Sequence, residues 1–247
     1  MSHSAAVADA VSSVSYEFVS ALADTPALLE ECYRIRYEVY CSERHFLVGQ
    51  NGVEQDEFDA NAQHIALLSR RTGAVVGTVR LVLPVEGSPT DSFPLQRVCG
   101  SALPDDMPLR YTAEISRFAI AKQRRGIHAA SLMRLGLLRG IIEVSPRLGV
   151  AHWCAVMEPA LLRLLATSSI QFKPIGSPVD YHGLRQPCYN SIAAVMDGIY
   201  FGRLAIWNYV TNFGDYWPPP NDAMCADIWR LSGGHQRKDV GRVRRGA

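Results

Sequence analysis

The order in which strand and helix patterns follow one another is the feature that most constrains the fold of this chain. Alternating or continuous apolar runs typical of strands occupy residues 16–22, 64–68, 75–83, 113–120 and 151–157. Apolar residues at helical spacing occupy residues 26–40, 127–144 and 159–167. The resulting order is strand, helix, hairpin, strand, helix, strand, helix, followed by short strands near Phe172 and Val179. This order predicts a mixed α/β sheet with helices on both faces.

Local signals support several of these elements. Thr25 and Pro26 have the residue types of an N-cap and a first helical position, and Pro146 is expected to stop the long second helix. Two irregular stretches separate the elements, residues 46–61 and residues 86–108, the latter with one helical turn near 93–98. A polar loop as long as 46–61 inside a compact domain is often functional. Residues 192–210 carry no pattern clear enough for an assignment.

Composition bounds the class of protein. The chain has 247 residues, of which 48% are hydrophobic, enough for a substantial core, and a formal net charge of +1 gives no general case for nucleic-acid binding. Six scattered cysteines without a CxxC pair fit a reducing compartment better than a disulfide framework or a zinc site. We expect a cytoplasmic protein with no transmembrane segment, a disordered leader over residues 1–15, and a loosely attached extension over residues 213–247.

The most chemically informative segment is the junction between the strand at 113–120 and the helix at 127–144. A basic loop there turns at Gly126, and the first N–H groups of the helix lack internal partners. Together with Arg124 and Arg125 they would form a site for a pyrophosphate or a phosphopantetheine phosphate. Taken alone, the same loop is explained at least equally well by a simpler interpretation, a solvated basic turn that caps an ordinary helix.

An ordered series of motifs carries a family resemblance. The runs Arg36-Tyr-Glu-Val-Tyr-Cys-Ser-Glu-Arg-His-Phe46, Glu54-Gln-Asp-Glu-Phe-Asp59, Val76-Gly-Thr-Val-Arg-Leu-Val-Leu-Pro84 and Glu114-Ile-Ser-Arg-Phe118 resemble the autoinducer (acyl-homoserine-lactone) synthases and the related N-acyl amino acid synthases. The run Val179-Asp-Tyr-His-Gly-Leu-Arg-Gln-Pro-Cys-Tyr189 is similar to acyltransferases associated with exosortase protein-sorting systems. The loop at 123–129 resembles the acyl-carrier loop of the GNAT superfamily. The resemblance implies one GNAT-like domain over residues 16–212, with a mostly antiparallel sheet.

The resemblance also implies an activity. An enzyme of this kind moves a long-chain fatty acyl group from acyl carrier protein, or from CoA, to a small amine, with no tightly bound cofactor and no metal. The chain carries Phe46 where autoinducer synthases usually carry Trp, and it is longer at its C-terminus. Both features favour an amino acid over a homoserine lactone precursor as acceptor. A CoA-dependent N-acetyltransferase and a non-catalytic acyl-thioester sensor remain the alternatives.

The reaction requires a base for the amine, donors for the oxyanion and close placement of the two substrates. By resemblance, the catalytic residues are Glu114, Arg117 and Phe118, with Glu114 as the base and backbone N–H groups near Phe118 as oxyanion donors. Strand alternation places residues 114 and 117 on opposite faces, so direct contact between them would require a bulge. An ion pair between Glu114 and Arg117 that braces the sheet is the competing interpretation.

Two further groups complete the expected site. The acceptor-binding residues are Arg36, Asp56, Asp59 and Arg80, although Arg80 could instead brace the two aspartates. The expected carrier-binding residues are Ile120, Lys122, Arg124, Arg125, Gly126, Ile127, His128 and Ala129, with Arg134 or Arg139 available to an acidic carrier. Without the resemblance, loop turns and surface salt bridges would explain Arg36, Asp56 and Asp59 equally well.

Other polar residues are more easily explained as structural. His64, His152 and His182 lack metal-ligand spacing, and Cys154 lies in an apolar strand where a thiol is usually inert. The stripe of Leu132, Leu135, Leu138 and Ile142 is expected to belong to the core more than to an acyl pocket. Arg185 and His182 are expected in a loop that contacts the wall of the active site.

Overall fold

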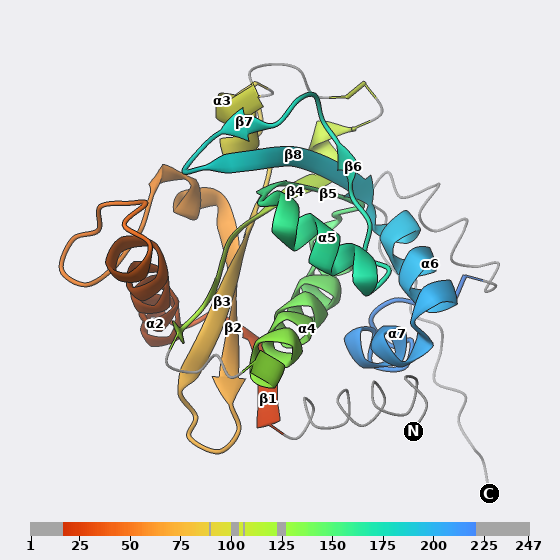
Figure 1. Cartoon of the computed structure of the whole chain (residues 1–247), viewed down its shortest axis with the longest axis horizontal. Helices are drawn as coiled ribbons and strands as arrows, with labels where there is room; N and C mark the ends of the chain where they lie inside the picture. The colour runs from red at the N-terminus through yellow and green to blue at the C-terminus, as the bar shows by residue number, and fades with distance from the viewer. Residues whose placement is uncertain (1–16, 89, 100–103, 106, 123–126, 221–247) are drawn as a thin grey trace, which may run out of the picture.

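The computed structural model describes residues 17–88, 90–99, 104–105, 107–122 and 127–220, with only the backbone considered at residues 127–129 and 131. Its centre is one twisted sheet with helices against it (Figure 1). The expected leader, most of the C-terminal extension, and Arg124, Arg125 and Gly126 of the basic loop lie outside the described residues.

The sheet has eight strands in the order β1-β2-β3-β4-β5-β8-β6, with β7 paired to β8. The strands are β1 (Phe18–Leu22), β2 (Ala62–Ser69), β3 (Val75–Val82), β4 (Thr112–Ile120), β5 (His152–Met157), β6 (Lys173–Pro174), β7 (Val179–Asp180) and β8 (Leu184–Ser191). Among the described pairs, β4 and β5 run parallel and the others run antiparallel. The predicted mixed, mostly antiparallel sheet is confirmed.

Helices cover both faces of this sheet. They are α2 (Pro26–Arg36), α3 (Pro94–Cys99), α4 (Ile127–Val144), α5 (Pro159–Thr167), α6 (Ile192–Gly202) and α7 (Leu204–Val210). Alternation along β2 explains how two of them share it: Ala66 packs in a cluster with Cys32 and Ile35 of α2, whereas Ile65 and Leu67 pack in the main core with α4. Figure 1 shows α2 and α4 on either side of β2 and β3.

The two ends of α2 follow from local chemistry. The Thr25 hydroxyl accepts a hydrogen bond from the backbone N–H of Leu28 at 3.3 Å, and Pro26 begins the helix, as the sequence predicts. The helical path continues past Arg36 as a π-helical segment, Tyr37–Glu43. Short π-helical segments often occur at functional sites, and this one brings Tyr40 to the centre of the molecule.

α4 approaches the sheet closely because it presents glycines to β2. A Cβ atom added at Gly136 would lie 2.6 Å from Leu67 Cδ1, and one added at Gly140 would lie 2.5 Å from Ile65 Cγ2. Since real Cβ atoms do not approach other atoms so closely, a larger residue would require the Leu67 side chain to move at Gly136, and at Gly140 it would press on both Ile65 and Ser20. α4 ends at Val144, before the 3₁₀ turn Pro146–Leu148.

The C-terminal third of the domain is where sequence patterns were least informative. Residues 184–191, expected as a loop, form β8 beside β5, and the unassigned residues 192–210 form α6 and α7. The packed part of the chain also extends beyond the boundary expected at residue 212, because Trp217 is only 4% exposed and lies in the main core. Within the described residues, no helix is long and apolar enough to cross a membrane.

The parallel pair β4–β5 separates along its length. Thr112, Ala113 and Glu114 pair with β5, whereas beyond Glu114 the described β4 residues pair with β3 alone and β5 continues beside β8. Among the described residues, the ladder between β4 and β5 therefore ends at Glu114. The edge of a strand beyond such a ladder can bind an extended ligand through main-chain hydrogen bonds.

Candidate active site

A β-bulge in β4 sets the geometry of the candidate site. Arg80 pairs with Ser116 and Thr78 pairs with Ala119, so one residue of β3, Val79, lies opposite both Arg117 and Phe118. Arg117 has φ of +50°, a left-handed conformation that non-glycine residues seldom adopt. Regular strand alternation would place the Arg117 side chain on the opposite face of β4 from the Ser116 side chain. The bulge interrupts this alternation.

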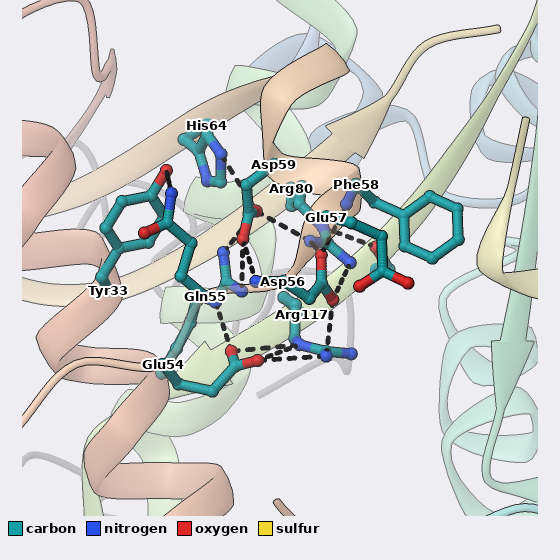
Figure 2. Close-up of polar contacts among 12 residues, drawn as sticks. Tyr33, Glu54, Gln55, Asp56, Glu57, Phe58, Asp59, His64, Arg80 and Arg117 are labelled. Carbon is teal, nitrogen blue, oxygen red and sulfur yellow. Dashed lines mark hydrogen bonds and ion pairs between the residues drawn. The ribbon is translucent and has the colours of Figure 1, made fainter. Parts of the chain in front are cut away.

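Three arginines and three carboxylates form one network of ion pairs at this bulge. Figure 2 shows the three carboxylates together with Arg80 and Arg117. From β4, Arg117 donates to both oxygens of Glu54 and, over 2.8 Å, to Asp56. From β3, Arg80 pairs with Asp56 and Asp59 and donates to Ser116 Oγ at 3.1 Å. Arg36 of α2 donates to Glu54 at 2.6 Å and to both oxygens of Asp59 at 2.7 and 3.0 Å.

The network is compact, charge-balanced and largely closed to solvent. The side chains of Arg36, Asp59 and Arg80 are 0% exposed, whereas Asp56 retains 18% and Arg117 13%. Asp56 and Asp59 also form a capping box that begins the 3₁₀ turn Glu57–Asn61, in which each side chain accepts a backbone N–H of this turn. The long loop after α2 is thus fixed to the sheet at the bulge.

Burial and charge act in opposite directions on the pKa values in this network. Burial alone would raise the pKa of Asp59, but the hydrogen bond from Arg36 and the positive charges of Arg36 and Arg80 hold it well below its usual range. Burial alone would lower the pKa of Arg117, but Glu54 and Asp56 raise it above its ordinary value. Both residues are therefore ionised across the physiological range.

Glu114 lies in a different environment four residues before the end of the bulge. It is 2% exposed, and one of its oxygens accepts the backbone N–H of Leu95 in α3 at 2.7 Å. Burial raises the pKa of Glu114 to about 7, although the Leu95 N–H and the nearby charges of Arg80 and Arg117 act in the opposite direction. A carboxyl group with a pKa near 7 has the property of a general base at neutral pH.

The structure does not pair Glu114 with Arg117. The guanidinium of Arg117 is bound by Glu54 and Asp56, and the described hydrogen-bond partner of Glu114 is a backbone N–H. The sheet-bracing ion pair considered for these two residues is therefore replaced by ion pairs of Arg117 with the loop. Sequence reasoning did not assign Glu54 to the site. Its acidic side chain next to the Asp56–Asp59 motif was the signal that could have identified it.

A cavity of about 510 Å³ occupies the gap between β4 and β5. It is within the size range of ligand-binding sites in proteins. Glu114, Arg117, Phe118 and Ile120 from β4 line it, and Trp153, Val156 and Met157 from β5 form the opposite wall. All three expected catalytic residues thus line one cavity, whereas the lining does not include Arg36, Asp56, Asp59 or Arg80.

The far walls of the cavity are apolar. Leu135, Leu138 and Ile141 come from α4, and Leu161, Leu164 and Leu165 come from α5. The stripe of α4 belongs to the core, as the sequence predicts, because Leu132, Leu135 and Leu138 pack against the main core and Ile142 is fully buried in it. Leu135 and Leu138 also line the cavity, so these two residues contact both.

Tyr40 links the π-helical segment to the bulge. Its hydroxyl donates to the Phe118 carbonyl oxygen at 3.0 Å, and its ring lies 5.6 Å from the Arg117 guanidinium carbon. Both Tyr40 and Phe118 line the cavity. This contact holds β4 in place at Phe118, near which the sequence predicts oxyanion donors.

The carrier-binding prediction falls partly on residues that are described. Ile120 lines the cavity, and the Lys122 backbone N–H donates to Glu43 while its side chain is exposed. Ile127, His128 and Ala129 begin α4, at the end of β4 next to the cavity. Arg134 lines the cavity, but Arg139 is engaged by the Tyr209 carbonyl and Asn212 and lies between two tyrosine rings. Arg139 is therefore not available to a carrier in this structure.

The structure shows the surroundings of the histidine, cysteine and arginine residues to which the sequence assigned no catalytic role. Burial raises the pKa of Cys154 well above its ordinary value and lowers that of His64 to about 4, so neither supplies a thiolate or a charged imidazole at neutral pH. Arg185 lies in β8, and both it and His182 line the cavity. Within the described residues, no cluster of His, Cys, Asp or Glu has the arrangement of a metal site.

Comparison with known proteins identifies a matching family and similar folds. Residues 35–134 match the family described as "Acetyltransferase (GNAT) domain". The fold is similar to that of the acyl-homoserine-lactone synthase LasI, with a TM-score of 0.62 and 19% identity over 76% of this chain and 96% of that one. It is also similar to BjaI, a CoA-dependent acyl-homoserine lactone synthase solved with SAM and isopentyl-CoA, with a TM-score of 0.56 and 24% identity over 79% of this chain and 88% of that one.

A third similar structure belongs to a protein whose name gives a different type of product. FeeM, an N-acyl amino acid synthase from uncultured soil microbes, has a TM-score of 0.50 and 16% identity over 76% of this chain and 96% of that one. The predicted GNAT-like fold, and its likeness to acyl-homoserine-lactone and N-acyl amino acid synthases, are thereby confirmed.

Proposed function

We propose that this chain, which carries a GNAT acyltransferase domain, transfers a long-chain fatty acyl group from a thioester carrier to the amine of a small acceptor, giving an N-acyl amino acid. The observation that carries the proposal is one cavity with two chemically different parts. Its polar part contains Glu114 and the stretch of β4 beyond the ladder with β5, and its apolar part is walled by α4 and α5. Similarity to named acyl-homoserine-lactone and N-acyl amino acid synthases supports the same class of reaction.

The proposed reaction uses the cavity as follows. Glu114, directly or through a water molecule, removes a proton from the acceptor ammonium, and the neutral amine nitrogen attacks the thioester carbonyl carbon. Backbone N–H groups of β4 between Phe118 and Ile120 stabilise the oxyanion. The C–S bond then breaks, and the second proton lost by the nitrogen passes to the departing thiolate, which gives the amide and the carrier thiol.

The arginine–carboxylate network has a positioning role in this proposal. Arg36, Asp59 and Arg80 are buried and bound to one another, so their contribution is to hold the bulge and the 54–61 loop in place. Arg117 and Asp56 retain some exposure, and Arg117 lines the cavity. Arg117 is therefore the member of the network best placed to contact a substrate.

Acyl carrier protein is the donor carrier that we propose. Lys122 is exposed at the end of β4, and Arg134 of α4 lines the cavity, so positive charge lies near the expected entry of a phosphopantetheine arm. The apolar walls extend well beyond the space that an acetyl group requires, which favours a fatty acyl donor over acetyl-CoA.

The test is an assay of purified protein with acyl carrier protein loaded with a long-chain acyl group, with the same acyl group on CoA, and with acetyl-CoA. A mixture of the twenty common amino acids serves as acceptor, and mass spectrometry detects N-acyl products. We expect long-chain N-acyl amino acids with the wild type and at least about a hundredfold less with Glu114→Gln.

Arg147→Gln is the control, because Arg147 is 66% exposed and does not line the cavity. Transfer of acetyl groups alone would replace the proposal with an N-acetyltransferase. Donor binding without turnover in any combination would support an acyl-thioester sensor.

A further inference from the structure

An ionic cluster outside the network described above lies at the cavity wall. Arg44 Nη1 and Arg185 Nη1 both contact the same oxygen of Glu158, Oε1, at 2.9 and 3.2 Å. Arg44 follows the π-helical segment, Glu158 occupies the N-cap position of α5, and Arg185 belongs to β8. All three residues line the cavity, so three separate parts of the chain bring their charges to one place.

The charges of this cluster do not balance. Within the described part of the chain, Glu158 is the one carboxylate that forms an ion pair with either arginine. Two guanidinium groups and one carboxylate leave one positive charge. Arg185 is the more enclosed of the two cations, with a side chain 13% exposed against 41% for Arg44. An uncompensated guanidinium at a partly enclosed cavity wall favours an anion more strongly than one in open water.

Aromatic rings fix the orientation of these cations. The guanidinium carbons of Arg44 and Arg185 lie 5.5 and 5.6 Å from the centroid of the Phe46 ring. The His182 ring stacks on Phe46 with centroids 5.6 Å apart and an angle of 20° between the planes. Held guanidinium groups lose less conformational freedom on binding a carboxylate, and their planar donors match its two oxygens.

We propose that Arg185, assisted by Arg44, binds the carboxylate of the acceptor amino acid. This inference rests on the proposed N-acyltransferase function and assigns the residues that recognise the carboxylate of its amino acid acceptor. The sequence assigned a carboxylate-binding role to Arg36, but Arg36 is 0% exposed and its donors are bound by Glu54 and Asp59. Arg185 and Glu114 line the same cavity, so the proposal places the carboxylate and the amine of the acceptor in one cavity.

The experiment compares one acceptor amino acid with its carboxamide. The amino acid is the best acceptor found in the mixture of twenty, and kcat/KM is measured for both forms with wild type, Arg185→Gln and Arg185→Lys. We expect wild type to prefer the free acid and Arg185→Gln to reduce that preference about 10- to 100-fold, mainly through KM for the acid. The carboxamide and the acyl donor should keep their KM values. Arg185→Lys, which keeps the charge but not the planar donor pair, should restore part of the preference.

The outcomes separate the inference from the proposed function. If no amine is acylated by folded wild-type protein, the proposed function and this inference both fail. If the acid and carboxamide are acylated equally, or if Arg185→Gln weakens both equally or raises KM for the donor, the reaction stands and the carboxylate subsite is wrong. Arg147→Gln should match wild type, and circular dichroism of Arg185→Gln verifies that it folds. Arg44→Gln, expected to show a smaller loss of preference, provides an independent second variant.

Discussion

At the residue scale, the candidate site contains two carboxylate environments with opposite properties. Asp59 lies among arginines that keep it ionised, whereas Glu114 is buried beside a single N–H donor, and its pKa is raised to about 7. Under the proposed function, residues with the same kind of side chain therefore have different roles: charge balance within the structure for Asp59 and proton transfer for Glu114. The difference comes from the atoms around each group.

The pH dependence of activity tests the role of Glu114. If Glu114 is the base, kcat/KM for the amine should rise as pH increases through about 7, because the deprotonated carboxylate is the active form. Glu114→Gln should lose this inflection together with most of the rate. An inflection near pH 7 that persists in the residual activity of Glu114→Gln would assign it to another group.

The stability of the fold should also depend on the ionisation of Glu114. The pKa of Glu114 is about 7 when folded and near its ordinary 4.5 when unfolded, so the folded state binds the proton more tightly. Its contribution to stability is complete below pH 4.5, declines between pH 4.5 and 7, and is absent above. Between pH 4.5 and 8, Glu114→Gln should therefore gain about 2–3 kcal/mol relative to wild type, as measured by urea unfolding. A constant difference across this range would show that Glu114 is not buried as described.

The buried arginines should be sensitive to truncation. Arg36→Met removes one of the two arginines that bind each of Glu54 and Asp59 and leaves the buried network with an uncompensated negative charge, so it should destabilise the protein by about 3–5 kcal/mol in chemical unfolding. Arg34→Met in the same helix is the matched control. Arg34 is 55% exposed in a pair with Glu30, and its loss should cost less than about 1 kcal/mol. Equal effects of the two variants would contradict the difference in burial.

At the element scale, the close contact between α4 and β2 places one wall of the cavity. Gly140 allows this contact, since a Cβ atom at that position would meet Ile65 Cγ2 at 2.5 Å and Ser20 Cβ at 3.0 Å. A displacement of α4 would also move Leu135 and Leu138, which line the cavity from the same helix. The glycine is therefore needed for packing in spite of its low helix propensity.

Gly140→Ala tests this contact. We expect a net loss of about 1–3 kcal/mol from overpacking, although alanine is the better helix former. The double variant Gly140→Ala with Ile65→Ala should recover part of the loss relative to the sum of the single variants, because Ile65→Ala removes the atom that the new methyl group meets. Thermal or urea unfolding of the four proteins gives the coupling. Strict additivity would mean that the two residues do not touch.

At the scale of the whole molecule, the cavity depends on elements that are distant in the sequence. β4 and β5 separate, α4 and α5 close the space between them, and the segment after α2 contributes Tyr40 and Phe46. Under the proposed function, the depth between α4 and α5 selects the acyl group. The acyl chain length should therefore respond to side-chain size on these two helices.

Leu165→Phe should shift donor preference toward shorter acyl chains, because Leu165 lines the apolar wall in α5. We expect kcat/KM for the longest accepted donor to fall about tenfold or more relative to a shorter one, measured in competition by mass spectrometry. Leu148→Phe is the control, since Leu148 is 37% exposed and does not line the cavity. An unchanged chain-length profile in Leu165→Phe would place the acyl group elsewhere.

The sequence by itself determined the elements with strong periodicity and the grouping of the charged motifs. The Thr25 cap, the β2–β3 hairpin, β4, α4 and β5 were predictable because their signals are local. The ordered motifs contain Arg36, Asp56, Asp59, Arg80 and Arg117, which the fold assembles at one bulge, although the sequence assigned Arg117 to a different group from the other four. β8 was missed because Pro187 and polar residues disguise a strand that is stabilised by its pairing with β5.

Only the tertiary structure decided which of those residues a substrate could reach. Burial of Arg36, Asp59 and Arg80 depends on the 54–61 loop folding back against the sheet, and the pKa of Glu114 depends on the burial of its carboxyl group. The cluster of Arg44, Glu158 and Arg185 joins residues from three separate parts of the chain. Solvent access and electric field are sums over neighbours distant in sequence, so no local pattern of residues encodes them.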